Sequence, residues 1–315
     1  MLRIAAKSGL DPVAERDRER RAIPKFREAA KLAHEALKEG WSTKGAQTFI
    51  NSLDNHAFSA IGDRRVDAIT AADIATVVSP IWTTKPDMAR KVRQRIGTVL
   101  NFAHSKGWRA TEAPGRSVTV GLPRQPKGGN YQAMPYADVP TFVADMIAKP
   151  ATTGRQALLF LIYTAARPGE VRAARWGQID AAKRDWNRPA GMMKTNEAHT
   201  VTLNAAALML LEEVKGGRSV KPDELIFSGQ RGAKLSDMTM NKVLRTASLP
   251  YDAHAFRSSF RDWAAELMPD IPDPVAEAAL AHVVPDKVVR AYKRTKFVEL
   301  RRQLLDGWGA YVAAE

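Results

Sequence analysis

The chain of 315 residues contains no cysteine, which excludes disulfides, thiolate metal sites and a cysteine nucleophile. It also lacks a long apolar run, because the longest, residues 157–166, is about half of what a bilayer span needs. Charges occur too early for the apolar core of a signal peptide. Hydrophobic residues at 45% and charged residues at 26% are typical of a globular protein and exclude a wholly disordered or fibrous one. We therefore expect a cytoplasmic protein with no membrane partner.

Acidic residues are in short supply. There are 34 Asp and Glu against 48 Lys and Arg, and the formal net charge is +14. Residues 1–130 hold 23 basic and 13 acidic side chains, whereas residues 131–315 hold 25 and 21. Such a surplus favours a polyanionic partner, most commonly nucleic acid. Enzymes of high isoelectric point without such a partner also exist, so composition alone leaves both interpretations open.

Four regions are expected along the chain. Residues 1–22 alternate in charge without core positions, which indicates a charged linker or the remnant of an earlier module. Residues 23–113 show helical periodicity, and residues 114–133 are rich in Gly, Pro and basic residues, which is typical of a linker. Residues 134–315 then form a mixed α and β domain that ends in a helix.

The clearest predicted helix covers residues 86–106. Its apolar stripe recurs at helical spacing and consists of Val92, Ile96, Val99, Leu100 and Ala103. The opposite face is basic, which suits either DNA or plain solvation. The predicted DNA-contacting residues of this helix and of the linker are Arg90, Lys91, Arg93, Arg116, Arg124 and Lys127.

Two segments of the second domain carry isolated basic residues. Arg167 ends an apolar helix over residues 154–164, and Pro168 after it suits the first position of the next helix, a junction where an anion can bind. Lys194 is expected at the tip of a hairpin, among short β-type runs. Each residue, considered alone, is more often an ordinary surface side chain.

Two further segments combine donors with aromatic residues. His254 and Arg257 are three apart, so we expect them on one helix face, with Arg261 continuing the stripe as a DNA contact. Such a face is either a phosphate clamp or a solvated basic surface. His282 is followed ten residues later by Tyr292, which basic residues flank. Tyr292 alone would be interpreted as a half-buried aromatic.

In combination, these residues have a more specific meaning. The ordered set Arg167, Lys194, His254, Arg257, His282 and Tyr292 resembles the tyrosine recombinase, or phage integrase, family. The segments 198–203, 260–264 and 301–308 are similar to prophage and genomic-island integrases, and residues 69–73 and 103–107 match their core-binding region more loosely.

The resemblance implies a mainly α fold: a helical, SAM-like core-binding domain and a mixed α+β catalytic domain with a small antiparallel sheet, together a C-shaped clamp on duplex DNA. Three departures are visible. Only residues 9–12 and the charged stretch after them look like an arm-binding domain, so we expect a truncated form, an internal start or a degenerate element. Gly191 stands where many relatives have arginine, and Ala255 where glycine usually follows the histidine.

The resemblance also implies a role for each residue. Tyr292 attacks the scissile phosphate, giving a 3′-phosphotyrosine and a free 5′-hydroxyl, and Lys194 is the general acid. Arg167 and Arg257 clamp the phosphate oxygens, His254 is a base or hydrogen-bond partner, and His282 donates to the phosphate. Glu170 is expected to support Arg167. Because a phenol has a pKa near 10, the phenolate costs roughly 4 kcal/mol at neutral pH unless neighbours assist. No cofactor or metal is expected.

The expected partner is double-stranded DNA with an attachment or core site. The protein would be a monomer in free solution and a homotetramer on DNA, exchanging strands through a Holliday junction, with an excision factor or DNA-bending protein as a further partner. Alternatives are type IB topoisomerase-like relaxation, a silent DNA-binding relic and a basic RNA-binding protein, for which aromatic signatures are lacking. For the final helix, Phe297, Leu300, Leu304 and Trp308 suit docking on a neighbouring protomer or on its own domain.

Overall fold

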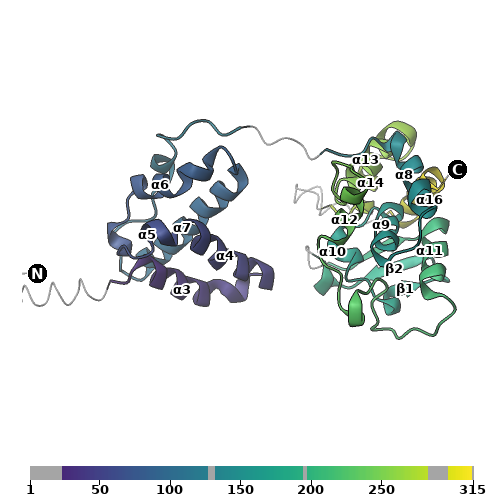
Figure 1. The fold of residues 1–315 in the computed structure, drawn as a ribbon, viewed down its shortest axis with the longest axis horizontal. Coiled ribbons are helices and arrows are strands. Elements are labelled where there is room, and N and C mark those ends of the chain that lie inside the picture. Colours follow the sequence, from purple (N-terminus) through teal and green to yellow (C-terminus); the bar gives the residue numbers. More distant parts are fainter. Residues whose placement is uncertain (1–22, 127–131, 194–196, 283–296, 314–315) are drawn as a thin grey trace, which may run out of the picture. The chain divides into compact units, whose positions relative to one another are not determined.

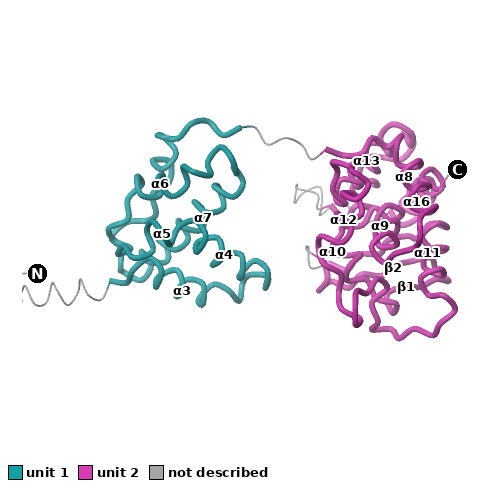
Figure 2. Tube along the Cα trace, viewed as in Figure 1, with its two compact units in different colours: residues 1–129 teal, residues 130–315 magenta. Residues whose placement is uncertain are grey.

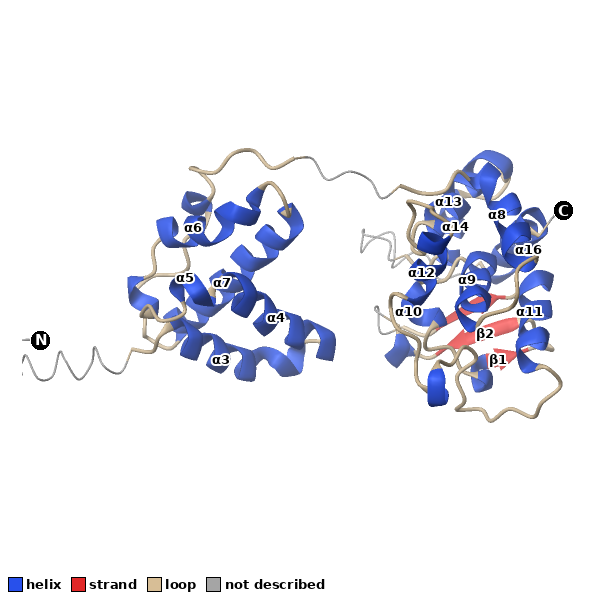
Figure 3. Cartoon of the chain, viewed as in Figure 1, coloured by secondary structure: helices blue, strands red, loops and turns tan. Residues whose placement is uncertain are grey.

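The computed structural model describes residues 23–126, 132–193, 197–282 and 297–313. The chain divides into two compact units, residues 1–129 and 130–315 (Figure 2). Helices dominate both units, and the strands drawn in Figure 3 belong to the second. Within the described ranges, no helix is both long enough and apolar enough to cross a membrane. The mainly helical fold with a small antiparallel sheet is therefore confirmed.

Over its described residues, 23–126, the first unit is a group of five helices around one core (Figure 1). They are α3 (Phe26–Leu37), α4 (Thr43–His56), α5 (Phe58–Ile61), α6 (Ala71–Trp82) and α7 (Pro86–Ser105). Short 3-10 turns cover Lys38–Gly40, Val66–Ala68 and Arg116–Val118.

Helix α7 confirms the clearest predicted helix, that over residues 86–106. Pro86 is its first residue, where a missing N–H costs nothing. Every residue of its predicted apolar stripe is fully buried. Helix α6 begins with a capping box, in which Thr70 Oγ1 accepts the Asp73 N–H at 3.3 Å and Asp73 Oδ2 accepts the Thr70 N–H at 2.9 Å.

Part of the segment expected as a linker packs against the first unit. Val118 is 1% exposed in the core of that unit. The indole N–H of Trp82 donates to Pro123 O at 2.7 Å, and Gln125 Nε2 donates back to Trp82 O at 3.0 Å. Residues 116–125 are therefore held by α6 rather than extended away from it.

Among its described residues, the second unit contains eight helices and three strands. They are α8 (Val139–Ile147), α9 (Thr153–Thr164), α10 (Pro168–Val171), β1 (Ile179–Asp180), β2 (Asp185–Arg188), β3 (His199–Thr202), α11 (Ala205–Lys215), α12 (Thr239–Thr246), α13 (Phe256–Leu267), α14 (Asp273–Ala279) and α16 (Val298–Val312). Further 3-10 turns cover Tyr136–Asp138, Trp176–Gln178, Ala190–Met192 and Gln230–Gly232.

The strands form an antiparallel sheet in the order β1-β2-β3. In the register of β2 and β3, Trp186 faces Val201 and Arg188 faces His199. Since side chains alternate along a strand, Trp186 and Arg188 share a face, and both are buried. One arginine of β2 is thereby carried into the interior of the unit.

Two helices organise the core beside this sheet. All residues from Ala157 to Thr164 of α9 are buried, which fits a helix surrounded by other elements. Helix α16 packs on the same unit, with Leu304 and Trp308 fully buried and the Trp308 indole N–H donating to Ile162 O at 2.7 Å. Of the two placements weighed for the last helix, the structure has packing on its own domain.

Candidate active site

Arg167 occupies the junction between α9 and α10. Ala165 ends α9 in the left-handed conformation at φ +48°, and Arg167 then caps α10. Glu170, three residues on, accepts the Arg167 backbone N–H at 2.9 Å through Oε2 and its Nη1 at 3.0 Å through Oε1. The short helix thus supplies Arg167 with a carboxylate that fixes both its backbone and its side chain.

Arg257 reaches the same junction from α13. It is only 4% exposed, and its Nη1 donates to Ala165 O at 2.6 Å while Nη2 donates to Leu280 O at 2.7 Å. Burial and the charge of Arg167 lower the pKa of Arg257 to about 10, which leaves the guanidinium charged at neutral pH.

His282 follows α14 and closes the group. Its Nε2 lies 3.0 Å from Arg257 Nη2, and its Nδ1 lies 2.7 Å from Glu277 Oε2. Ala281, in the left-handed conformation at φ +50°, accepts Arg167 Nη2 at 3.0 Å. Burial raises the pKa of Glu277, but hydrogen bonds from Arg261 and His282 outweigh it and hold that pKa below the usual value. The carboxylate therefore orients the imidazole.

His254 lies in a turn just before α13, not on the helix face that its spacing from Arg257 predicted. Ala255 caps the helix at φ −66°, so the position does not need the glycine that relatives usually have there. Desolvation, and then the charge of Arg257, lower the pKa of His254 below its ordinary value. His254 is consequently a neutral imidazole at neutral pH, able to accept a proton.

The assembled group carries more positive than negative charge. Arg167 and Arg257 belong to segments about 90 residues apart and lie in the same group. The Glu170 carboxylate, which contacts the Arg167 side chain, also pairs with Arg188, so its negative charge is shared between two guanidinium groups. The Nε of Arg257 is buried with no hydrogen-bond partner among the described residues. Buried guanidinium groups in excess of carboxylates favour an anionic ligand, and their planar forks suit phosphate oxygens.

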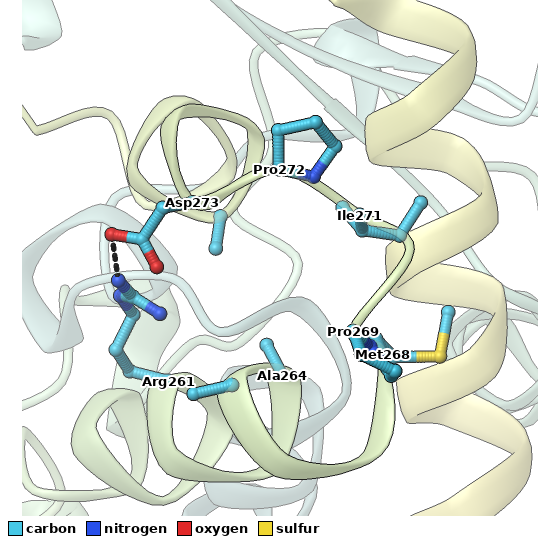
Figure 4. Close-up of a pocket in the computed structure, with 9 residues that line it drawn as sticks. Arg261, Ala264, Met268, Pro269, Ile271, Pro272 and Asp273 are labelled. Carbon is cyan, nitrogen blue, oxygen red and sulfur yellow. Dashed lines mark ion pairs between the residues drawn. The ribbon is translucent and has the colours of Figure 1, made fainter.

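Arg261 does not extend this group. Its guanidinium is engaged by Asp273 and by Glu277, with Nε 2.8 Å from Glu277 Oε1. Arg261 and Asp273 border a cavity of about 190 Å³ between α13 and α14, lined mainly by apolar residues such as Met268 (Figure 4). Arg261, the predicted DNA-contacting residue, is therefore paired with two carboxylates, because α14 packs against the face of α13 that carries it.

The other predicted contacts fall into two groups. Lys194, Tyr292 and Lys127 lie outside the described residues. In the first unit, Arg90 pairs with Asp87 and donates from Nη1 to Gln125 Oε1 at 2.7 Å. Exposure at the remaining positions is high for Lys91, Arg116 and Arg124 and partial for Arg93. Within the described ranges, no group of three or more His, Asp and Glu side chains is arranged to hold a metal.

Sequence reasoning missed the residues behind this group. Arg188 bonds Glu170 from β2, and His199 on β3 lies 3.3 Å from Arg301 of α16, measured from Nε2 to Nη1. Desolvation, and then the charges of Arg188 and Arg301, lower the pKa of His199 to about 3. The available signal was the strand alternation, which puts Arg188 on the same face as Trp186.

Comparison with known sequences identifies the family. The profile of the phage integrase family matches residues 134–298, and that of the phage integrase central domain matches residues 26–118. The chain belongs to the phage integrase family. The two matched regions divide between the two units of the structure and include the whole group around Arg167 and Arg257.

Curated proteins similar to this chain include two prophage integrases of Escherichia coli. Prophage integrase IntA is 32% identical over 273 residues, covering 84% of this chain and 64% of IntA. Prophage integrase IntZ is 28% identical over 312 residues, covering 96% of this chain and 75% of IntZ. The chain thus spans a little under two thirds of the length of IntA.

Solved integrase structures share the fold. A lambda integrase tetramer bound to a Holliday junction aligns with a TM-score of 0.66 at 17% identity, covering 94% of this chain and 85% of that one. A lambda integrase dimer bound to a core site, residues 75–356, aligns with a TM-score of 0.64 at 16% identity, covering 83% and 96%. At such identities the likeness shows the architecture of an integrase and does not extend to individual residues.

Proposed function

We propose that the chain is a site-specific DNA recombinase that cuts and rejoins duplex DNA through a 3′-phosphotyrosine on Tyr292, to integrate or excise a prophage or genomic island. The observation that carries this proposal is the pair formed by the partly exposed Arg167 and the buried Arg257, whose charge exceeds that of the carboxylate beside it. Membership of the phage integrase family and similarity to two prophage integrases support it.

In the cleavage step, the Tyr292 oxygen forms a bond to phosphorus and the bond from phosphorus to the 5′ oxygen breaks. Lys194 gives that leaving oxygen its proton, and His254, kept neutral by its lowered pKa, takes the proton of the phenol. Arg167 and Arg257 stabilise the charge that develops on the non-bridging oxygens. A 5′-hydroxyl reverses the step on a new strand, so the joining reaction consumes no nucleotide.

His282 is the third donor in this scheme. Its Nδ1 is taken by Glu277, so Nε2 is the ring atom that remains for the phosphate. In the free protein Nε2 lies against Arg257 Nη2. An arriving phosphate oxygen would separate these two nitrogens, accepting a hydrogen bond from Arg257 Nη2 and, when both ring nitrogens carry a proton, one from His282 Nε2. Glu277 therefore acts through His282, by fixing which nitrogen it presents.

The DNA partner follows from the same proposal. We propose that both units bind one duplex as a clamp at a core site, and that four copies assemble on a Holliday junction from free monomers, assisted by an excision factor or DNA-bending protein. The excess of basic residues in 1–130 supports a DNA-binding role for the first unit. The lambda integrase tetramer on a Holliday junction supports the assembly.

A suicide-substrate experiment tests the nucleophile. A core site is first selected by binding from a pool of random duplexes, then prepared with a nick so that the released 5′ fragment diffuses away. Wild-type protein, Tyr292→Phe and the matched control Tyr311→Phe are mixed with this duplex, labelled separately on each strand end, and run on a denaturing gel. We expect a covalent band attached through the 3′ phosphate for wild type and Tyr311→Phe, and none for Tyr292→Phe.

The other outcomes are equally informative. A covalent band that still forms with Tyr292→Phe would show that another residue is the nucleophile. Absence of a band for wild type on a duplex that it binds contradicts strand transfer and leaves a DNA-binding protein. If the band forms, recombination between two core-site duplexes, compared with relaxation of a supercoiled plasmid, separates a recombinase from a type IB topoisomerase-like enzyme.

A further inference from the structure

Strand β2 buries a charged side chain behind the candidate site. The Arg188 side chain is 2% exposed, its guanidinium carbon lies 5.1 Å from the Trp186 ring centroid, and its Nη1 donates to Glu170 Oε2. Its Nε has no hydrogen-bond partner among the described residues. A buried arginine with an unsatisfied nitrogen costs folding free energy that an aliphatic side chain would not. Such a cost is explained most simply by a function.

The partner of Arg188 is already occupied by another arginine. Glu170, with a side chain 9% exposed, uses Oε1 for Arg167 Nη1 and Oε2 for both the Arg167 backbone N–H and Arg188. One carboxylate therefore lies between two guanidinium groups in a nearly dry environment. The trio has a net charge of about +1, whereas Arg167 and Glu170 alone would be neutral.

We propose that Arg188 is a positioning residue, which holds the Glu170 carboxylate in place and offsets its charge so that Arg167 keeps its own charge for the phosphate. Without Arg188, the whole carboxylate charge would fall on Arg167 and compete with the phosphate for that guanidinium. The inference rests on the proposed role of Arg167 as a phosphate ligand. Arg188 itself acts only through Glu170.

The test uses the full chain and the covalent-complex assay. Arg188→Met, similar in length and uncharged, is expected to lower the rate of covalent complex formation at saturating duplex by at least about 10-fold, while duplex affinity changes by less than about 3-fold. Arg188→Lys keeps the charge and is expected to stay within about 3-fold of the wild-type rate. The control is Arg302→Met, an arginine that pairs with Asp185 of the same strand at 3.1 Å.

A double substitution separates charge balance from simple structural support. If Arg188 offsets the charge of Glu170, then Arg188→Met combined with Glu170→Gln is expected to react several-fold faster than Arg188→Met. A purely structural role predicts that the double variant is slower than either single variant, and this result overturns the proposal. If Arg188→Met fails to fold, a folded Arg188→Lys that is slowed by 10-fold or more overturns it as well.

A phosphate titration keeps this inference distinct from the proposed reaction. Melting temperatures are measured with inorganic phosphate against chloride at equal ionic strength. We expect phosphate to stabilise wild type and Arg302→Met, to do so at most half as much in Arg188→Met, and to regain its effect in the double variant. This pattern together with no covalent band would refute the reaction and keep the role of Arg188, whereas equal phosphate effects in all variants would refute that role.

Discussion

Two alanines hold the carbonyl groups that the candidate site uses. Ala165 and Ala281 have φ of +48° and +50°, and their oxygens accept Arg257 Nη1 and Arg167 Nη2. The left-handed region costs a residue with a Cβ about 1–2 kcal/mol, and such strain gathers at functional sites. The backbone here therefore gives up stability to direct two carbonyl oxygens toward two arginines.

This strain predicts the effect of glycine. Ala165→Gly and Ala281→Gly should each raise the free energy of unfolding by about 0.5–1 kcal/mol, because the relief of strain exceeds the entropy that glycine adds to the unfolded chain. The measurement is urea unfolding followed by circular dichroism. Ala278→Gly, inside α14, is the control and should lose about 1 kcal/mol. Loss of stability at both left-handed positions would refute the strain.

His199 predicts how stability depends on pH. Its pKa is lowered to about 3, below the unfolded value near 6.5, so between these values the unfolded chain binds the extra proton. Stability should fall as the pH decreases through this window, by at most about 1.4 kcal/mol per unit from this residue. Urea unfolding at pH 7 and pH 4.5 should show a weaker dependence for His199→Gln.

The control for this prediction is His104→Gln. His104 lies on the first unit, and its Nδ1 contacts Arg109 O at 3.0 Å. It should keep the pH dependence of wild type. An unchanged dependence in His199→Gln would mean that His199 is protonated in the folded protein, in contact with Arg301.

At the scale of elements, α16 ties the end of the described chain to the sheet and to α9. Asn204, after β3, donates from Nδ2 to Tyr163 O at 2.8 Å and to Leu305 O at 3.0 Å, and caps α11. Gly309 of α16 lies directly against it, since a Cβ there would be 2.3 Å from Asn204 Cγ. This close contact requires glycine at position 309, although alanine normally stabilises a helix more than glycine does.

Two glycines of α16 therefore make a matched pair. Gly309→Ala should lower the free energy of unfolding by about 2–3 kcal/mol, because the Cβ displaces a buried, fully bonded Asn204. In Gly307→Ala the new Cβ lies 3.3 Å or more from Trp263 and Met268, so the loss should be under about 1 kcal/mol. Thermal and urea unfolding measure the stability of both variants. An equal loss of unfolding free energy in the two would contradict the packing of Gly309 of α16 against Asn204.

At the scale of the whole molecule, the net charge of +14 governs how the protein meets DNA. Each phosphate contact releases a counterion, so the logarithm of duplex affinity should fall linearly with the logarithm of salt concentration. Substituting both Arg90 and Lys91 by alanine should reduce that slope by about 2 if both touch phosphates. Fluorescence anisotropy over a salt series measures the slope.

The control for the salt series is Arg218→Ala, since Arg218 is paired with Glu224 on the second unit. It should leave the slope unchanged. A duplex affinity of the wild type that does not change with salt would contradict the clamp. An unchanged slope in the double variant would show that Arg90 and Lys91 do not contact DNA phosphates.

Local pattern was sufficient for much of this protein. Residue type and spacing identified the helices now seen as α7 and α9, because each buries a stripe or a whole surface that its own sequence displays. For the small sheet, the residues indicated only short β-type runs, and the antiparallel arrangement was implied by the family resemblance. The family was indicated by the order of six residues, which is specific only as a set: Arg167, Lys194, His254, Arg257, His282 and Tyr292.

Only the tertiary structure decided which side chains form hydrogen bonds and ion pairs with one another. Arg167 meets Ala281 across 114 residues, and Arg257 meets Ala165 across 92. Arg261, predicted as a DNA contact, is paired with Asp273 and Glu277, whereas Arg188, which the sequence did not single out, is paired with Glu170. Burial and pairing depend on contacts between distant segments. A local pattern records the type of each side chain but not the partner that folding brings to it.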